Sequence, residues 1–149
     1  MTNMNSNEIR IGNLVYPKGS STLSHVTGIF ENLCCLSGIN NKYSKHYLFE
    51  QISPIELSES ILEKFKFKKD EHGYWWIEFD RRYLSLIPSQ DGYWYPVLVQ
   101  CPEVSSESEQ HVSINRIKYA HQIQNLFFSI SHLELVFETK IQINENAKN

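Results

Sequence analysis

Residues 116–138 read RIKYAHQIQNLFFSISHLELVFE and carry two hydrophobic periods in succession. With about 100° between successive helical residues, the apolar side chains of the first part share an arc of roughly 120°. They are Tyr119, Ala120, Ile123, Leu126, Phe127 and Ile130. The polar side chains on the opposite side are Lys118, His121, Gln122, Asn125 and Ser129. This pattern predicts a helix over residues 116–130 that packs across a sheet and keeps one face in water, with Ser113 as a suitable N-cap.

The end of the same stretch has the two-residue period of a half-buried strand. Leu133, Leu135 and Phe137 occupy alternate positions there. Residues 131–132 then mark the end of the helix, and we expect residues 133–137 to add a strand to one edge of a sheet.

The first part of the chain reads as short strands separated by turn residues. We predict strands over residues 10–16, 25–30, 33–36 and 47–52, the last of them ending at Pro54. Several strands within about fifty residues are typical of a small, strongly bent barrel, and the pattern favours an SH3-like one.

Residues 57–100 predict a short helix followed by an aromatic sheet. Ser58 is a natural N-cap, and Glu59 stands in the first turn, where the helix dipole favours a negative charge. An antiparallel meander is expected over residues 74–80, 83–87 and 93–100. Pro96 has no backbone N–H, which predicts an edge position or a bulge for its strand. Residues 101–111 (CPEVSSESEQH) are expected to form an acidic, serine-rich loop.

Together these elements predict an α+β fold in one domain of 149 residues. Residues 8–56 would form the small barrel-like β region. Residues 57–142 would hold the short helix, the aromatic meander, the long helix and the edge strand.

Three segments of the chain resemble a group of small uncharacterised proteins from Bacteroidetes and from their phages or mobile elements. They are NEIRIGNLVY at residues 7–16, PIELSESILEKFKF at residues 54–67 and IKYAHQIQNLFFSISHLEL at residues 117–135. The segments occur in the same order in that group, which tends to have glycine after the helix where this chain has His132. The resemblance implies a protein of phage or mobile-element type, and it implies no activity.

The composition is that of a folded globular chain. Hydrophobic residues make up 41% of it and aromatic residues 13%, and the net charge of −3 gives no bulk attraction for nucleic acid or acidic membranes. No window approaches the roughly 18 apolar residues of a membrane helix, and MTNMNSNEIR lacks the layout of a signal peptide. The three cysteines, two of them adjacent, make a poor disulfide framework. We therefore expect a cytoplasmic protein with no membrane partner.

Residues 74–95 hold an unusual density of aromatic side chains. They are Tyr74, Trp75, Trp76, Tyr83, Tyr93, Trp94 and Tyr95. Strand alternation would bury about half of them and leave the others to pair across strands, to contact a protein or second copy, or to stack on bases or sugars. Trp76, Tyr93 and Tyr95 are the candidates for such contacts. The cations near them in sequence are Lys64, Lys66, Lys68, Lys69, Arg81 and Arg82. Acidic residues between the cations leave a merely solvated surface as the alternative.

The long helix adds Lys118, His121 and Asn125 as candidate contact residues. His121 and Asn125 lie one turn apart and could orient each other or hydrogen-bond a neighbouring loop. A hydrolytic pair needs a nucleophile, and no G-x-S-x-G motif accompanies it. The histidines and cysteines also lack metal-binding spacing. The sequence therefore predicts no catalytic residue, no metal and no cofactor.

We expect a non-catalytic intracellular binding or adaptor protein that acts through protein contacts or self-association. The alternative is a nucleic-acid-binding accessory protein whose aromatic and basic surface holds a single strand.

Overall fold

The computed structural model describes residues 4–40, 44–102, 104 and 107–138. Two five-stranded antiparallel sheets and two α-helices give it an α+β fold, as the sequence predicts. The chain divides into two compact units. Unit 1 holds Met1–Leu57 and Tyr119–Ser129, and unit 2 holds Ser58–Lys118 and Ile130–Asn149. Most of the long helix thus groups with the N-terminal part of the chain and not with residues 57–142, the end of which lies outside the described residues.

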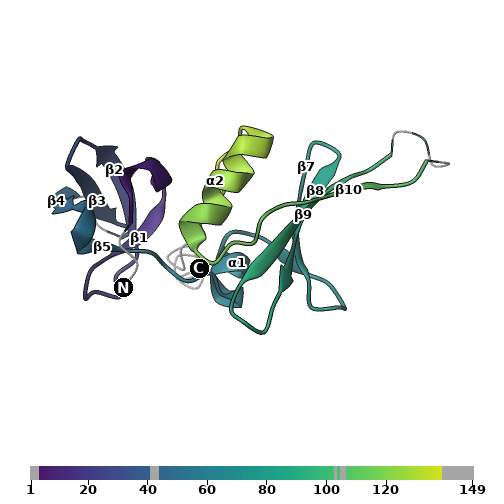
Figure 1. Cartoon of the computed structure of the whole chain (residues 1–149), viewed down its shortest axis with the longest axis horizontal. Coiled ribbons are helices and arrows are strands. Elements are labelled where there is room, and N and C mark those ends of the chain that lie inside the picture. Colours follow the sequence, from purple (N-terminus) through teal and green to yellow (C-terminus); the bar gives the residue numbers. More distant parts are fainter. Residues whose placement is uncertain (1–3, 41–43, 103, 105–106, 139–149) are drawn as a thin grey trace, which may run out of the picture. The chain divides into compact units, whose positions relative to one another are not determined.

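Unit 1 is built on a sheet with the strand order β4-β3-β2-β1-β5 (Figure 1). The strands are β1 (Leu14–Pro17), β2 (Ser24–Ile29), β3 (Leu33–Gly38), β4 (Ser44–Leu48) and β5 (Ile52–Ser53). The residues of its buried core are Met4, Ile9, Val15, Val26, Cys34, Leu36 and Ile52. A register shift between Val26 and Gly28 marks a bulge in β2. The outer strands β4 and β5 do not pair with each other in the described part of the chain, so the expected SH3-like barrel is not confirmed.

The strand predicted over residues 47–52 consists of two strands separated by one turn of 3-10 helix, η2 (Phe49–Gln51). β4 pairs with β3, and β5 pairs with β1. The turn therefore carries the chain from one edge of the sheet to the other. A side-chain hydrogen bond helps to hold it, because the Leu48 N–H donates to Gln51 Oε1 at 3.0 Å. The turn was not predicted because apolar residues stand on both sides of it, so residues 47–52 have the composition of a single strand.

Unit 2 is built on a sheet with the strand order β10-β9-β8-β7-β6. The expected meander is present as β7 (Trp75–Phe79), β8 (Arg82–Pro88) and β9 (Trp94–Gln100). The edge strands β6 (Lys68–Lys69) and β10 (Gln110–Ser113) were not predicted. Both are short and polar, and β10 begins within the segment expected to be a loop, so neither has a hydrophobic period to reveal it.

The short helix α1 (Glu59–Lys64) lies beside this sheet (Figure 1). Its predicted N-cap is confirmed, because Ser58 Oγ accepts a hydrogen bond from the Ile61 N–H at 3.3 Å. The helix ends in a Schellman turn, in which the Phe67 N–H donates to the Leu62 carbonyl at 3.0 Å. Lys66 takes the left-handed position of that turn at φ 68°. The turn buries Phe67 and leads the chain directly into β6.

Pro96 lies within an inner strand, which corrects the prediction of an edge or a bulge. β9 pairs with β8 in unbroken register and with β10 on its other side. The ladder to β10 ends at the pair Ser113↔Val97, one residue before Pro96. The Pro96 nitrogen, which has no hydrogen to donate, therefore lies just beyond the last residue pair of the β9–β10 ladder. Its carbonyl still accepts a hydrogen bond from the Ile114 N–H at 3.0 Å.

Residues 133–138 do not form the predicted edge strand. Leu135 is buried, and the Phe137 ring meets Phe65 edge-to-face with centroids 5.3 Å apart. The Glu138 N–H donates to the Lys64 carbonyl at 2.8 Å, at the end of α1. The expected alternation holds only for Leu135 and Phe137, because Leu133 is exposed. The end of the segment packs against α1 and its C-cap Phe65 and does not extend a sheet.

The long helix α2 spans Ala120–Ser131 and begins later than predicted. Ser113 is not its N-cap, because this residue pairs with Val97 in β10. Gln122 caps the first turn instead, since its Oε1 accepts from the Tyr119 N–H at 3.0 Å. At the other end His132 has φ 60°, so the chain adopts the left-handed turn in spite of its Cβ.

Gln124 joins α2 to the sheet of unit 1. Its side chain is 3% exposed, its Oε1 accepts from the Leu14 N–H at 2.8 Å, and its Nε2 donates to the Gly12 carbonyl at 3.1 Å. The side-chain amide of Gln124 thus bonds the Gly12 carbonyl and the Leu14 N–H in the way that the backbone of a neighbouring strand would. Leu14 and Ile123 are fully buried, so apolar contacts accompany these hydrogen bonds.

We predict that Gln124→Ala lowers the free energy of unfolding by about 2–4 kcal/mol, because it leaves two buried backbone groups without their partners. Urea unfolding followed by circular dichroism measures the change. Ser129→Ala is the matched control on the exposed side of α2 and should alter stability by less than about 0.5 kcal/mol. Equal effects of the two substitutions would contradict the role given to Gln124.

Candidate functional site

The second sheet has an inner face of buried side chains and an outer face that is partly open. Buried side chains on the inner face are Trp75, Phe79, Leu84, Leu86, Trp94 and Pro96. The register sets Trp76 opposite Ser85 and Ser85 opposite Val97, so these residues form a row on the other side. We define the outer face as Trp76, Tyr83, Ile87, Tyr93, Tyr95 and Val97. Tyr95 is 41% exposed and the other five are half-buried.

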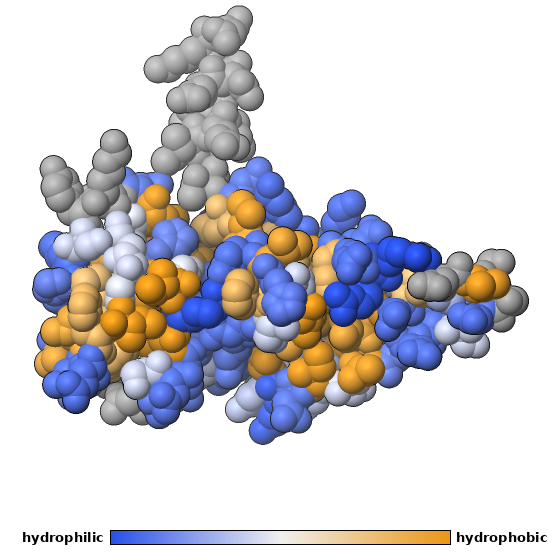
Figure 2. Space-filling model, turned by 90° about the horizontal axis from the view of Figure 1, so that it is seen from above, coloured by the Kyte–Doolittle hydropathy of each residue, from blue (hydrophilic) through white to orange (hydrophobic). Residues whose placement is uncertain are grey.

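Apolar side chains reach the surface elsewhere too, scattered among hydrophilic ones (Figure 2). The large exposed ones outside this sheet include Ile11, Phe30, Leu48, Leu133 and Val136. What sets the outer face apart is that its members come from adjacent paired strands and contain several aromatic rings.

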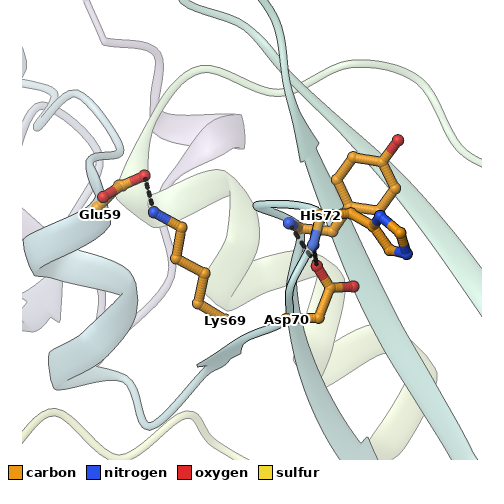
Figure 3. A network of polar contacts seen from close by, with 5 residues as sticks. Glu59, Lys69, Asp70 and His72 are labelled. Atoms are coloured by element: carbon orange, nitrogen blue, oxygen red, sulfur yellow. Dashed lines mark hydrogen bonds and ion pairs between the residues drawn. The ribbon is translucent and has the colours of Figure 1, made fainter.

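Trp76 is positioned by the tight turn between β6 and β7. Asp70 Oδ1 accepts hydrogen bonds from the backbone N–H groups of His72 and Tyr74, each at 2.9 Å (Figure 3). This turn pairs Lys68 with Trp76, and the Lys68 ammonium lies 5.5 Å from the centroid of the indole ring. On β6 itself, Lys69 Nζ forms an exposed ion pair with Glu59 of α1 at 3.1 Å (Figure 3).

A shallow hollow of about 220 Å³ lies beside Trp76. Its lining residues are Lys66, Lys68, Trp76, Ile77 and Glu78. On the side of β8, the Trp76 ring meets Tyr83 edge-to-face at 6.4 Å. Burial and the neighbouring Glu109 carboxylate raise the pKa of Tyr83, so its hydroxyl stays protonated and can donate.

Tyr93 lies at the other end of the outer face, beneath two cations. The Arg116 guanidinium lies 3.9 Å from its ring centroid, and the Lys118 ammonium 5.6 Å from it. Arg116 also contacts Asp91 at 3.7 Å. Hydrogen bonds from Ser89 and from the Tyr93 N–H lower the pKa of Asp91, with a further contribution from Arg116. Ile117 pairs with Trp94 on the inner side, which turns its neighbours Arg116 and Lys118 toward the outer face.

Arg81 and Arg82 are not brought together with Trp76 on this face. Arg81 is exposed in the β7–β8 turn at φ 60°. Arg82 alternates with the outer-face residue Tyr83, and its guanidinium stacks over the inner-face ring of Phe79 at 5.0 Å. It also donates to the Ile130 carbonyl at 3.4 Å. Of the lysines predicted as contacts or nearby cations, Lys66, Lys68 and Lys118 do lie near the outer face, and Arg116 joins them.

Asn125 takes part in a polar cluster that joins α2 to the N-terminal segment. Its Oδ1 accepts from Asn13 Nδ2 at 2.8 Å and from Arg10 Nε at 3.3 Å, and its Nδ2 donates to the Glu8 carbonyl at 2.9 Å. Both ends of the amide are therefore used within unit 1. Of the two roles expected for Asn125, the structure favours hydrogen bonding to a neighbouring segment over orientation of His121.

His121 is buried, although the helical period had placed it on the wet side. It is 3% exposed and stacks on the Tyr119 ring with centroids 5.8 Å apart. Its Nδ1 has no hydrogen-bond partner among the described residues. Burial lowers the pKa of His121, and the carboxylate of Glu8 opposes this shift in part.

Arg116 and Ile87 belong to this region and were not among the predicted contact residues. The sequence pattern placed Arg116 at the start of the helix. In the structure Ile117 pairs with Trp94, and this pairing brings the adjacent Arg116 over the ring of Tyr93. Strand alternation within residues 83–87 was a usable signal for Ile87, since it fixes the face shared by Tyr83 and Ile87.

Comparison with protein-family models, curated proteins and solved structures finds no match for this chain. Within the described ranges, no cluster of three or more His, Cys, Asp or Glu residues could hold a metal ion. The helices in that part of the chain are all too short or too polar to cross a membrane.

We predict that acid weakens the fold through His121. Because its pKa is lower in the folded than in the unfolded state, the unfolded chain gains a proton first as the pH falls below about 6.5. Stability should therefore be complete above that pH and decrease below it. Urea midpoints between pH 8 and pH 5 should fall less for His121→Phe than for the unchanged chain. His72→Phe, at an exposed histidine, is the control and should keep the original pH dependence; no difference between the variants would refute the assignment.

Proposed function

We propose that this chain is a non-catalytic binding protein of phage or mobile-element type, and that its outer face contacts a partner protein. The observation that carries the proposal is the set of half-exposed aromatic rings on adjacent strands of a sheet whose other face is filled. The resemblance of three sequence segments to proteins of phages and mobile elements supports the biological setting.

The chemistry of the outer face favours a protein as partner. Tyr and Trp are enriched in protein interfaces because they give large apolar contact and one polar end at a low entropic cost. Ile87 and Val97 add aliphatic surface beside Tyr95. The hydroxyl of Tyr83 is already oriented toward Glu109, at 3.4 Å from Oε2. Such a row can bury a partner's apolar side chains and still satisfy its own polar groups.

A non-catalytic role agrees with the use of the polar groups. Asn125 is engaged in the cluster with Asn13 and Arg10, and Gln124 holds the backbone of residues 12–14. His121 is buried against Tyr119. These residues stabilise unit 1, and none of the contacts described for them pairs a nucleophile with a base.

Photo-crosslinking tests the protein partner. We expect Tyr95→p-benzoylphenylalanine to give a discrete protein adduct in bacterial lysate, because position 95 is the most exposed point of the outer face. The same crosslinker at the exposed position Lys45 of unit 1 is the control and should give none. Adding Ile87→Ser should reduce the adduct at position 95 by about tenfold, since it removes a central contact. Equal labelling from positions 95 and 45 would refute the proposal.

A single strand of nucleic acid is the second candidate, and the cations over the outer-face rings support it. Arg116 and Lys118 lie over Tyr93, and Lys68 lies over Trp76. A ring with a cation beside it can stack a base and neutralise the adjacent phosphate. Glu78 lies near Lys68 and Asp91 near Arg116, and both carboxylates weaken this potential.

A fluorescent oligothymidine distinguishes this candidate from the first. If a base stacks on Tyr93, fluorescence anisotropy should show that Tyr93→Ala weakens binding about 5- to 150-fold. Arg116→Gln should weaken binding and reduce its dependence on salt, since one phosphate contact is lost. Arg81→Gln, in the turn, is the matched control and should change little. Absence of binding at 20 mM salt would eliminate nucleic acid as the partner.

A further inference from the structure

The four sheet edges in the described part of the chain differ in how they are protected. β4 contains Lys45, β5 is followed by Pro54, and β6 consists of Lys68 and Lys69. Lysine and proline are the residues that usually prevent a sheet edge from pairing with another chain. β10, with the sequence QHVS, contains neither, and all four of its residues are exposed. We call the side of this strand that faces away from β9 the β10 edge.

The backbone geometry shows which groups the β10 edge presents. Along a strand, the N–H and C=O of successive residues point alternately to either side. The Ile114 N–H bonds to Pro96 of β9, so Val112 and Gln110 also direct their backbone groups to β9. The backbone groups of His111 and Ser113 therefore point outward. Within the described ranges, no hydrogen bond is made to them.

The side chains along the β10 edge suit a second copy of the same strand. We propose that two copies of this chain pair through the β10 edge in antiparallel orientation, with Val112 on the two-fold axis. His111 of each copy would then lie opposite Ser113 of the other and exchange both backbone hydrogen bonds with it. Val112, which is 56% exposed in one copy, would pack against its own equivalent.

Charge around the strand favours this orientation. Glu107 and Glu109 precede Val112, and Arg116 and Lys118 follow it. Antiparallel pairing brings the acidic side of one copy alongside the basic side of the other, whereas parallel pairing would oppose like charges. The Glu109 side chain is 47% exposed and that of Arg116 is 51% exposed, so the charge of each is accessible to an approaching second copy. The pairing leaves the outer face uncovered, and the inference stands whether or not that face binds a partner.

The contact is small, and we expect weak association. Strands of four residues bury much less than the area typical of stable interfaces, which suggests a dissociation constant of about 0.1–1 mM. Sedimentation equilibrium of the full chain from 10 µM to 2 mM should therefore give a mass that rises from monomer toward dimer.

Two substitutions test the geometry against a general tendency to associate. His111→Pro removes an outward N–H without affecting the bonds to β9, and it should raise the dissociation constant at least tenfold. His111→Thr, the matched control, keeps that N–H and should leave association unchanged. Val112→Lys places like charges on the axis and should also abolish the dimer, and circular dichroism of each variant shows whether the fold is intact.

Two results would overturn the proposal: a chain that is still monomeric at 2 mM, or a dimer whose dissociation constant is unaffected by His111→Pro and Val112→Lys. Loss of the dimer in Tyr95→Ser with normal association of His111→Pro would place self-association on the outer face instead, and would also refute pairing through the β10 edge.

Discussion

The side-chain amide of Gln124 is the interaction on which the arrangement of unit 1 depends. It occupies the hydrogen-bonding positions of Gly12 and Leu14, so α2 is joined to the chain around β1 as a strand would be. Asn125 extends the same contact to Glu8, Arg10 and Asn13. A buried amide without partners would be costly, so this helix can be buried here only in one register. That requirement fixes both its position and its rotation.

The connection between the units follows from this contact. The chain leaves unit 1 after Leu57 and returns at Tyr119, and the Ala120 N–H bonds to the Ile55 carbonyl at 2.8 Å close to the point of exit. Along the chain, Ser58–Lys118 thus lies between the two parts of unit 1, and Ile130–Asn149 completes unit 2. α2 packs within unit 1 through Gln124 and Asn125. The outer face of the second sheet is where we propose that a partner binds.

Much of the local structure was predictable from single segments. The Ser58 cap, the strands of the meander and the apolar arc of α2 are all set by residues near one another in sequence. The errors have a common cause. Ser113, Pro96, Arg116 and residues 133–138 each received a role from their neighbours in sequence, while their actual role comes from a partner elsewhere in the chain. That partner is β9 for Ser113, β8 and the Ile114 N–H for Pro96, Tyr93 for Arg116 and the C-terminal end of α1 for residues 133–138. His121 belongs to the same class, since burial overrides its helical phase.

The sequence by itself determined the α+β class, the order of the main elements and the alternation that separates Trp75 from Trp76. These depend on period, caps and turn residues, which act over a few positions. The tertiary structure alone decided which aromatic face is open, which cations lie over it and which sheet edge is unprotected. Those features depend on the pairing of strands within unit 2, and residues so far apart leave no shared pattern in a single sequence.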